Sequence, residues 1–331
     1  MSDSDSDDLF AEGDSSIMDA AARFGVLDML DGPAKAVEQT AAGFAELLAT
    51  APELVALGNS NLGDEGLARL STALATAPGA SVTALDVEDN GIGDEGAAAL
   101  AEALKGGALP NLTTLAMTNN NVGGAGMATI SSALAGGALV QLSSCDFNGN
   151  QLGDAGLVAL GGAIAKGAFA QLSRLYLNKT GVTDAGLVDF SAAITSGEDS
   201  SLVMPKLYEL WLSNNSIGDA GASALFAAFE KGAMDNLGDL RLQYNQLGDG
   251  ACSSLVGVLG AYPLSNVWYL GLNDNAFSDA GLAALEVALG NGVLPRLEFL
   301  TASSPQSSVA MQQQVQDTFT HRERPPKPPR K

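Results

Sequence analysis

A thirty-residue repeat constrains this chain more than any other feature of its sequence. Residues 82–96, VTALDVEDNGIGDEG, define the template LxxLxLxxNxLGDxG. The template returns at residues 112–126, 142–156, 172–186, 207–221, 237–251 and 267–281, with a degenerate first copy at 52–66 and a truncated last copy from residue 297. Nine copies at regular spacing predict one repeat array rather than two ordinary globular domains.

The asparagine column of the template measures the spacing. Its members are Ser60, Asn90, Asn120, Asn150, Thr180, Asn215, Asn245, Asn275 and Pro305. Neighbouring members are thirty residues apart, except that five extra residues separate Thr180 from Asn215. The extra residues fall in the polar stretch 196–205, which predicts a longer surface loop at this point of the array.

Each column of the template has a structural role. The apolar residues of LxxLxL alternate, so they share the inward face of a short strand. The asparagine amide is expected to satisfy backbone groups of neighbouring turns and so to form a ladder along the stack. The aspartate of GDxG stands where a helix begins, and we expect each aspartate to cap its own helix. Apolar residues at three- and four-residue spacing, such as Leu157, Leu160 and Ile164, then predict the helix itself.

Strand and helix spacings together predict the curvature of the array. Parallel strands lie about 4.8 Å apart, whereas packed helices need about 10 Å. A stack with strands on one side and helices on the other must therefore curve toward its strands. We predict an α/β horseshoe solenoid with parallel strands on the concave face and helices on the convex face.

The repeated LxxLxLxxNxLGDxG pattern, with a helix in every copy, resembles the leucine-rich repeat superfamily, specifically its ribonuclease-inhibitor-like class. The resemblance covers residues 52–305. It implies a non-enzymatic scaffold or regulator that binds a protein partner through the concave face and its adjoining loops. Ran GTPase-activating proteins belong to the same class, so a GTPase-activating regulator of a small GTPase is the alternative. Beyond the shared repeat, no feature of this sequence matches those proteins.

The two ends of the chain differ from the repeats. Residues 1–16 form an acidic tail that is expected to be disordered, and residues 17–51 have the helical patterning of an N-terminal cap. Residues 306–320 predict a C-terminal capping helix, with Met311, Val315 and Phe319 on one face. Residues 321–331 form a basic, proline-rich tail whose PPKPPRK sequence fits the ligand pattern of SH3-type domains.

Charge and composition narrow the class of partner and compartment. The formal net charge of −22 disfavours nucleic acid as a partner, because phosphates would be repelled at long range. The acidic N-terminus lacks the pattern of a secretory signal, and no apolar stretch reaches membrane-spanning length. With only two cysteines, the sequence favours a reducing compartment, the cytoplasm, with the nucleus as the alternative.

The sequence offers little catalytic or metal-binding chemistry. Its single histidine, His321, lies in the tail, which excludes a histidine-based triad or zinc site from the repeats. Cys145 stands in a leucine column and Cys252 at a helix start, and both are interpreted as core or boundary thiols. The aspartate row is interpreted as helix caps rather than a calcium ladder. We therefore predict no catalytic residue, no cofactor and no metal.

A group of large side chains on the concave face is the candidate binding site. The third, fifth and seventh positions of LxxLxLxxN are expected to face out of the curve, with the eighth at its edge. In the first half of the array these columns are small or acidic. The second half predicts a partner-binding patch of Arg174, Tyr176, Lys179, Trp211, Arg241, Tyr244 and Tyr269. The alternative is that the aromatics shield the sheet or pair with neighbours such as Glu209 and Asp239, and Trp268 is interpreted as a packing residue.

Overall fold

The computed structural model describes residues 39–50, 52–76, 79–197, 203–261 and 264–322. The chain divides into two units, Met1–Glu38 and Gln39–Lys331, and every described residue belongs to the second. The predicted acidic tail, residues 17–38 of the predicted N-terminal cap and the proline-rich segment 323–331 lie outside the described residues.

Each template copy forms one short strand followed by one helix. Within the described residues, nine strands form a single sheet in chain order, and every neighbouring pair is parallel. The strands are β1 (Leu54–Ala56), β2 (Ala84–Asp86), β3 (Thr114–Ala116), β4 (Ser144–Asp146), β5 (Arg174–Tyr176), β6 (Glu209–Trp211), β7 (Asp239–Arg241), β8 (Tyr269–Gly271) and β9 (Phe299–Thr301). The register pairs each template position with the same position of the next copy, as in Asp86↔Ala116 and Ala116↔Asp146.

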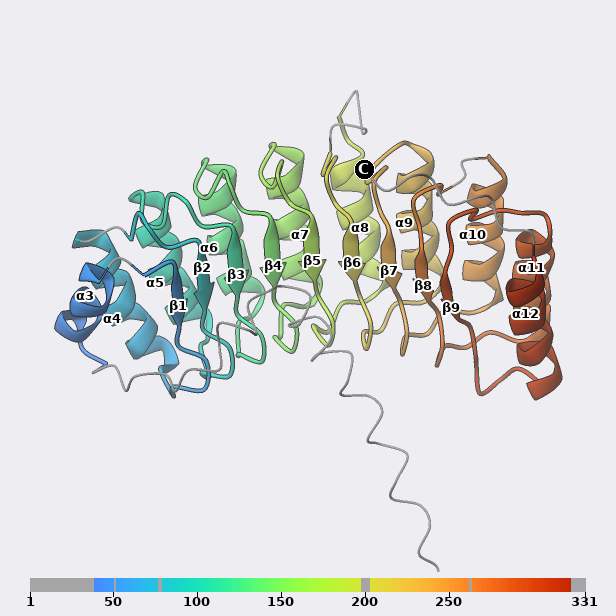
Figure 1. Cartoon of the computed structure of the whole chain (residues 1–331), viewed down its shortest axis with the longest axis horizontal. Coiled ribbons are helices and arrows are strands. Elements are labelled where there is room, and N and C mark those ends of the chain that lie inside the picture. The colour runs from blue at the N-terminus through green and yellow to red at the C-terminus, as the bar shows by residue number, and fades with distance from the viewer. Residues whose placement is uncertain (1–38, 51, 77–78, 198–202, 262–263, 323–331) are drawn as a thin grey trace, which may run out of the picture. The chain divides into compact units, whose positions relative to one another are not determined.

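The helices form a second layer along the sheet (Figure 1). They are α3 (Ala41–Ala49), α4 (Gly63–Thr76), α5 (Asp94–Lys105), α6 (Gly124–Ala135), α7 (Gly153–Ala165), α8 (Asp184–Ile194), α9 (Asp219–Glu230), α10 (Asp249–Ala261), α11 (Asp279–Gly290) and α12 (Val309–His321). The array of repeats is an α/β horseshoe solenoid with its strands on the concave face and its helices on the convex face, as predicted.

The core between the layers is aliphatic. The template leucines of strand and turn are buried, and the helix positions that face them are buried with them, such as Leu100 and Leu104 in α5. Cys145 replaces a strand leucine and Cys252 lies at the start of α10, and both are buried. Burial raises the pKa of both thiols, that of Cys252 to about 12, which favours their role as core residues over reactive thiolates.

The asparagine column forms the predicted ladder. Asn120 Oδ1 accepts hydrogen bonds from the backbone N–H of Asn90 (3.1 Å) and of Ile92 (3.0 Å). Its amide nitrogen donates to Val87 O of the preceding coil (2.9 Å) and to Met117 O of its own (3.0 Å). Each asparagine thus joins two coils at a buried turn. At Thr180 the hydroxyl donates to Leu177 O of its own coil (2.8 Å) and to Asn215 Oδ1 of the next coil (3.3 Å), but within the described residues it makes no bond to the preceding coil.

The aspartates of GDxG cap the neighbouring helix, and the prediction that each caps its own helix is wrong. Asp64 Oδ1 accepts from the backbone N–H of Gly93 (2.6 Å) and of Gly96 (2.9 Å), at the start of the next helix, α5. The N-cap position of α5 is Gly93, which has no side chain to cap with, and Asp94 already lies inside the helix. The preceding coil therefore supplies the cap, so these carboxylates join repeats rather than stabilise single helices.

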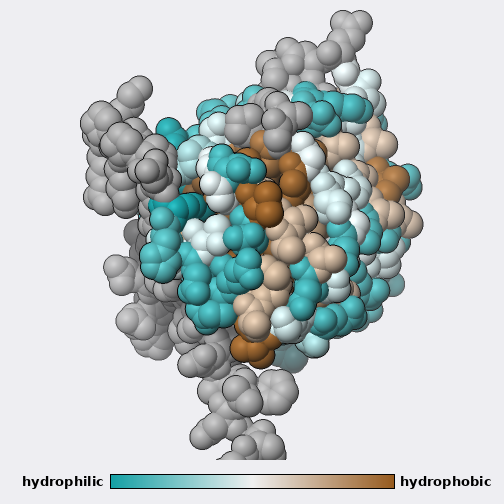
Figure 2. Space-filling model, turned by 90° about the vertical axis from the view of Figure 1, so that its right-hand side faces the viewer, coloured by the Kyte–Doolittle hydropathy of each residue, from teal (hydrophilic) through white to brown (hydrophobic). Residues whose placement is uncertain are grey.

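Helices close both ends of the described array. In α3, Phe44 and Leu48 are buried. In α12, Val315 and Phe319 are buried, and the Thr318 hydroxyl donates to Glu286 of α11 (2.7 Å). Figure 2 views this end of the array and shows hydrophobic residues in brown among hydrophilic ones in teal. Val309 of α12 is 80% exposed, so this helix leaves an apolar side chain on the surface.

Candidate functional site

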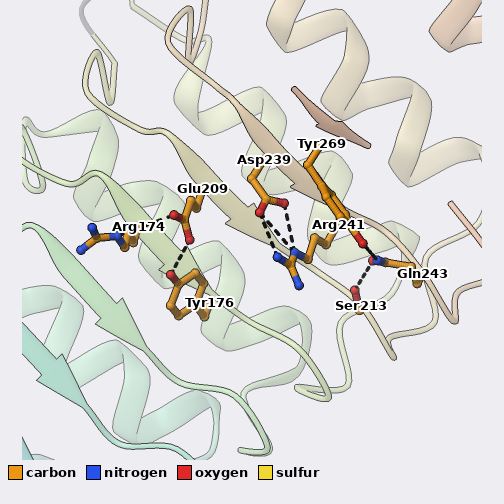
Figure 3. Close-up of polar contacts among 8 residues, drawn as sticks. All are labelled: Arg174, Tyr176, Glu209, Ser213, Asp239, Arg241, Gln243 and Tyr269. Atoms are coloured by element: carbon orange, nitrogen blue, oxygen red, sulfur yellow. Dashed lines mark hydrogen bonds and ion pairs between the residues drawn. The ribbon is translucent and has the colours of Figure 1, made fainter. Parts of the chain in front are cut away.

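The register of the sheet aligns the predicted patch in two adjacent rows on the concave face. One row contains Tyr176, Trp211 and Arg241, from β5, β6 and β7. The second row contains Arg174, Glu209, Asp239 and Tyr269, from β5 to β8. Figure 3 shows how the polar groups of these rows point toward one another.

Tyr176, Trp211, Arg241 and Tyr269 form a continuous stack, called the stacked cluster below. The rings of Tyr176 and Trp211 lie 4.1 Å apart between centroids. The Arg241 guanidinium carbon lies 3.9 Å from the centroid of Trp211 and 4.6 Å from that of Tyr269. Parallel strands are spaced about 4.8 Å apart, close to the stacking distance of planar groups, so side chains in one row lie face to face.

Two carboxylates hold the stacked cluster in place. Asp239 accepts from Arg241 Nε and Nη2, both at 3.0 Å, in a forked ion pair (Figure 3). Glu209 Oε2 accepts from the Tyr176 hydroxyl at 2.5 Å, and Glu209 Oε1 lies 3.8 Å from Arg174 Nε. Burial, and then the Glu209 charge, raise the pKa of Tyr176, which keeps its hydroxyl protonated as a donor.

The predicted exposure of Tyr176 and Trp211 is wrong. Tyr176 retains 1% of its accessible surface and Trp211 retains 4%. Stacking covers their faces, and the alternative reading, that these side chains pair with Glu209 and Asp239, describes the geometry correctly for Tyr176 and Arg241. Tyr269 is half-buried and Arg174 is partly exposed, so these two reach the surface of the concave face.

Trp211 also carries a buried donor with no acceptor. Its indole Nε1 is inaccessible to water and has no hydrogen-bond partner. Nearby polar groups are already engaged: the Ser213 hydroxyl donates to Gln243 Oε1 (2.7 Å), and Gln243 Nε2 donates to the Tyr269 hydroxyl (3.3 Å). An unpaired buried donor costs about 1–3 kcal/mol, so this indole lowers the stability that the stacked cluster contributes.

Lys179 and Tyr244 occupy unusual backbone positions at the edge of the concave face. Both have left-handed backbone conformations with φ of 55°. The same position in other repeats is also left-handed and holds Asn59, Asp89, Asn119, Gly149, Asn214 and Asp274. Asparagine, aspartate and glycine tolerate this conformation, whereas lysine and tyrosine do so at a cost. Lys179 is exposed and Tyr244 is 52% exposed.

The first half of the concave face has a different chemistry. Asp86, Glu88 and Asp146 project there from β2, from the turn that follows it, and from β4. Burial raises the pKa of all three, that of Glu88 to about 7 and that of Asp146 to about 6. Repulsion from neighbouring carboxylates adds to each shift. From the sequence, this half was expected to carry small or acidic residues, and no function was predicted for it.

The described part of the chain contains no candidate metal site and no candidate membrane-spanning helix. Among residues 39–50, 52–76, 79–197, 203–261 and 264–322, no group of three or more histidine, cysteine or acidic side chains is placed to hold a metal ion. No described helix has the length and apolarity to cross a membrane.

Comparison with known proteins agrees with this geometry. A family model described as Leucine Rich repeat matches residues 80–101, 108–131, 142–161 and 203–226. Four coils of the array are therefore supported as leucine-rich repeats. Each match begins before a strand and ends within the helix that follows, so each matched segment contributes to both layers of the solenoid.

Solved structures and curated sequences add little to the leucine-rich repeat assignment. The structure of Leiomodin-1 Actin-Binding Site 2 is similar to this chain at 21% sequence identity, over 40% of this chain and 75% of that one, with a TM-score of 0.34. No curated protein sequence matches the chain.

The strand residues of the predicted patch lie on the concave face of the sheet, but their pairing with Glu209 and Asp239 was only the alternative interpretation. The forked Asp239–Arg241 ion pair joins two residues of β7, whereas the bridge from Glu209 to Tyr176 and Arg174 joins β6 to β5. A signal for them was present, because Arg174, Glu209 and Asp239 occupy the same template position in successive copies.

Proposed function

We propose that this leucine-rich repeat protein is a non-enzymatic scaffold or regulator of the ribonuclease-inhibitor-like class. In this proposal it binds a protein partner through its concave face. The proposed site is the patch of Arg174, Tyr176, Lys179, Trp211, Arg241, Tyr244 and Tyr269. Within the patch, Lys179, Tyr244 and Tyr269 contact the partner, and the other members of the stacked cluster support them from beneath.

The observation that carries the proposal is the identity of the residues in the left-handed turn. A side chain that disfavours its backbone conformation lowers stability by about 1 kcal/mol. Six other repeats place asparagine, aspartate or glycine there, so the fold needs neither Lys179 nor Tyr244. Lysine and tyrosine at the rim of one face are better explained by contact with a partner than by folding.

The stacked cluster supports the same proposal through its rigidity. Asp239 and the two flanking rings fix Arg241, and Trp211 is fixed between Tyr176 and Arg241. A partner that docks on side chains already ordered loses less conformational entropy on binding. Tyrosine, tryptophan and arginine are also the residues that dominate binding energy at protein interfaces.

The test is a variant that removes the contacts without weakening the fold. Lys179→Asn/Tyr244→Asn installs the residue that other repeats use, so its melting temperature is expected to equal or exceed that of the wild type. Proteins captured from lysate by the wild type are expected to be lost from this variant, and the purified partner is expected to bind it at least tenfold more weakly.

A matched control changes the helical face instead. Val188→Asn/Lys231→Asn also removes one exposed apolar group and one positive charge, and it is expected to retain the partner. If the two variants retain the same proteins as the wild type, the concave rim is not the contact surface and the proposal fails.

The GTPase-activating alternative rests on class resemblance alone. Within the described residues, no feature favours it over plain binding. A GTP-hydrolysis assay with purified small GTPases separates the two: acceleration by the wild-type protein would support the alternative, and its absence would leave the scaffold proposal.

A further inference from the structure

Two carboxylates flank an open position on the acidic half of the concave face. The register places Ala116 of β3 between Asp86 of β2 and Asp146 of β4. Ala116 is partly exposed and its methyl group is short, so the space above it stays open. A group centred there lies one strand spacing, roughly 5 Å, from each acidic neighbour. Asp86, Ala116 and Asp146 are called the acidic bay below.

The carboxylates of the acidic bay have no cationic partner among the described residues, unlike the carboxylates of Glu209 and Asp239 in the second half of the array. Asp239 is paired with Arg241, and Glu209 with Arg174. Asp86 is 8% exposed, and its contact is with the backbone N–H of Glu88 (3.0 Å). Among the described residues, no lysine or arginine forms an ion pair with Asp86 or Asp146. Buried carboxylates are rarely left without a partner, because removing a charge from water is costly.

A second buried group lies in the adjacent row of the concave face, where Ser144 is paired with Thr114 of β3. Ser144 and Asp146 occupy alternate positions of β4 and so share its concave side, whereas Cys145 faces the core. Ser144 is 1% exposed, and its hydroxyl oxygen has no hydrogen-bond partner. A buried hydroxyl beside an unneutralised carboxylate can accept from a donor that enters between the strands.

We propose that the acidic bay binds the guanidinium of an arginine in a basic segment of the protein partner. The carboxylates of Asp86 and Asp146 accept from its two sides, and the Ser144 hydroxyl accepts from a remaining N–H. Arginine fits better than lysine, because its planar fork offers five donors to acceptors that lie in different directions. This inference rests on the proposed function, since it names the chemistry of a partner on the same concave face.

Proton binding by the acidic bay and by the neighbouring Glu88 should make the proposed contact sensitive to pH. Burial, followed by the charges of Asp86, Asp89 and Asp146, raises the pKa of Glu88 to about 7. Burial also raises the pKa of Asp146 to about 6, against the opposing effect of hydrogen bonds from Asn148 and Thr118.

The strands that flank the acidic bay, β1 and β5, place no lysine or arginine in an ion pair with Asp86 or Asp146. On the β1 side the neighbour is Gly58, and on the β5 side Arg174 pairs with Glu209. A bound cation favours the ionised carboxylates, so binding is expected to weaken as the pH falls from 8 to 5.5.

The experiment measures binding of fluorescein-labelled hexa-arginine to the full chain by anisotropy at pH 8. Asp86→Asn/Asp146→Asn is compared with Asp189→Asn/Glu230→Gln, which removes the same charge from exposed positions on α8 and α9. We expect at least a tenfold loss of affinity in the first variant and less than a twofold change in the second. Hexa-citrulline, which is neutral, is expected not to bind, and hexa-lysine is expected to bind more weakly than hexa-arginine.

Equal losses in the two variants would show that the overall negative charge, and not the acidic bay, attracts the peptide. No loss in either would place binding elsewhere. Both results overturn the inference, and melting temperatures confirm that the variants are folded. The proposed function is tested separately, by loss of the partner from Lys179→Asn/Tyr244→Asn. Failure of the arginine experiment therefore does not refute the proposed function, and failure of the partner experiment does not refute the acidic bay.

Discussion

At the scale of single residues, the concave face divides into a neutralised half and an unneutralised half. In the second half of the array, each buried carboxylate of the two rows has a cationic or hydroxyl partner, as Glu209 has in Arg174 and Tyr176. In the first half, Asp86, Glu88 and Asp146 repel one another and are partly desolvated. This difference makes the acidic half sensitive to pH near neutrality.

Replacing Glu88 by glutamine should therefore stabilise the protein at pH 8 and have little effect at pH 5. The folded-state pKa of about 7 lies above the ordinary value of 4.5, so the folded protein holds a proton that the unfolded chain releases between these limits. The stabilising contribution of this group is complete below pH 4.5 and is lost as the pH rises through 7. Melting curves at the two pH values measure the difference.

Glu230→Gln, at the exposed end of α9, is the control for the Glu88 variant. It removes the same formal charge outside the acidic half, and we expect it to leave the melting temperature at pH 8 nearly unchanged. An equal rise in both variants at pH 8 would assign the effect to net charge rather than to Glu88.

At the scale of elements, the GDxG aspartates transfer stability from one repeat to the next. Asp94 Oδ1 accepts from the backbone N–H of Gly123 (2.6 Å) and of Gly126 (2.9 Å), which belong to the start of α6. Asp94→Ala should lower the free energy of unfolding by about 1–2 kcal/mol. Amide hydrogen exchange should accelerate at Gly123 and Gly126, whereas acceleration at the start of α5 would contradict the cap between repeats.

The asparagine ladder is interrupted at Thr180, and restoring it should stabilise the protein. An asparagine there could donate to Phe147 O and accept from the Leu152 N–H, the contacts that Asn150 makes with Met117 O (2.8 Å) and the Val122 N–H (3.0 Å). Thr180→Asn should therefore raise the free energy of unfolding by about 1 kcal/mol.

Denaturant titration measures the effect of closing the ladder. Thr180→Val is the control, and it should destabilise the protein because it removes the hydrogen bond to Leu177 O. Destabilisation by asparagine as well would mean that the turn at Thr180 lacks the space for a complete ladder.

The strands, the helices and the concave side follow from the template, because alternation and spacing determine which face of each element is apolar. Contacts between copies were harder to foresee. The aspartate was assigned to its own helix because Gly93 was not read as the N-cap residue. Trp211 was expected to be exposed because one repeat alone does not show that Tyr176 and Arg241 cover it.

At the scale of the whole array, stability depends on contacts between neighbouring repeats, so the ends are its weakest points. Phe319 is buried in the last helix, and Phe319→Ala should cost about 3–5 kcal/mol locally. Hydrogen-exchange protection should fall most in α11 and β9 and remain unchanged in α4 to α6. A uniform loss of protection would instead mean that the array unfolds as one unit.

Side-chain oxidation footprinting of the complex with the captured partner tests the central claim that the concave face is the binding surface. Tyr244 and Tyr269 report on that face, and Val158 and Val188 report on the exposed side of α7 and α8. The partner is predicted to protect both tyrosines and to leave both valines as reactive as in the free protein. Protection of the valines with unchanged tyrosines would place the partner on the helices and contradict the account.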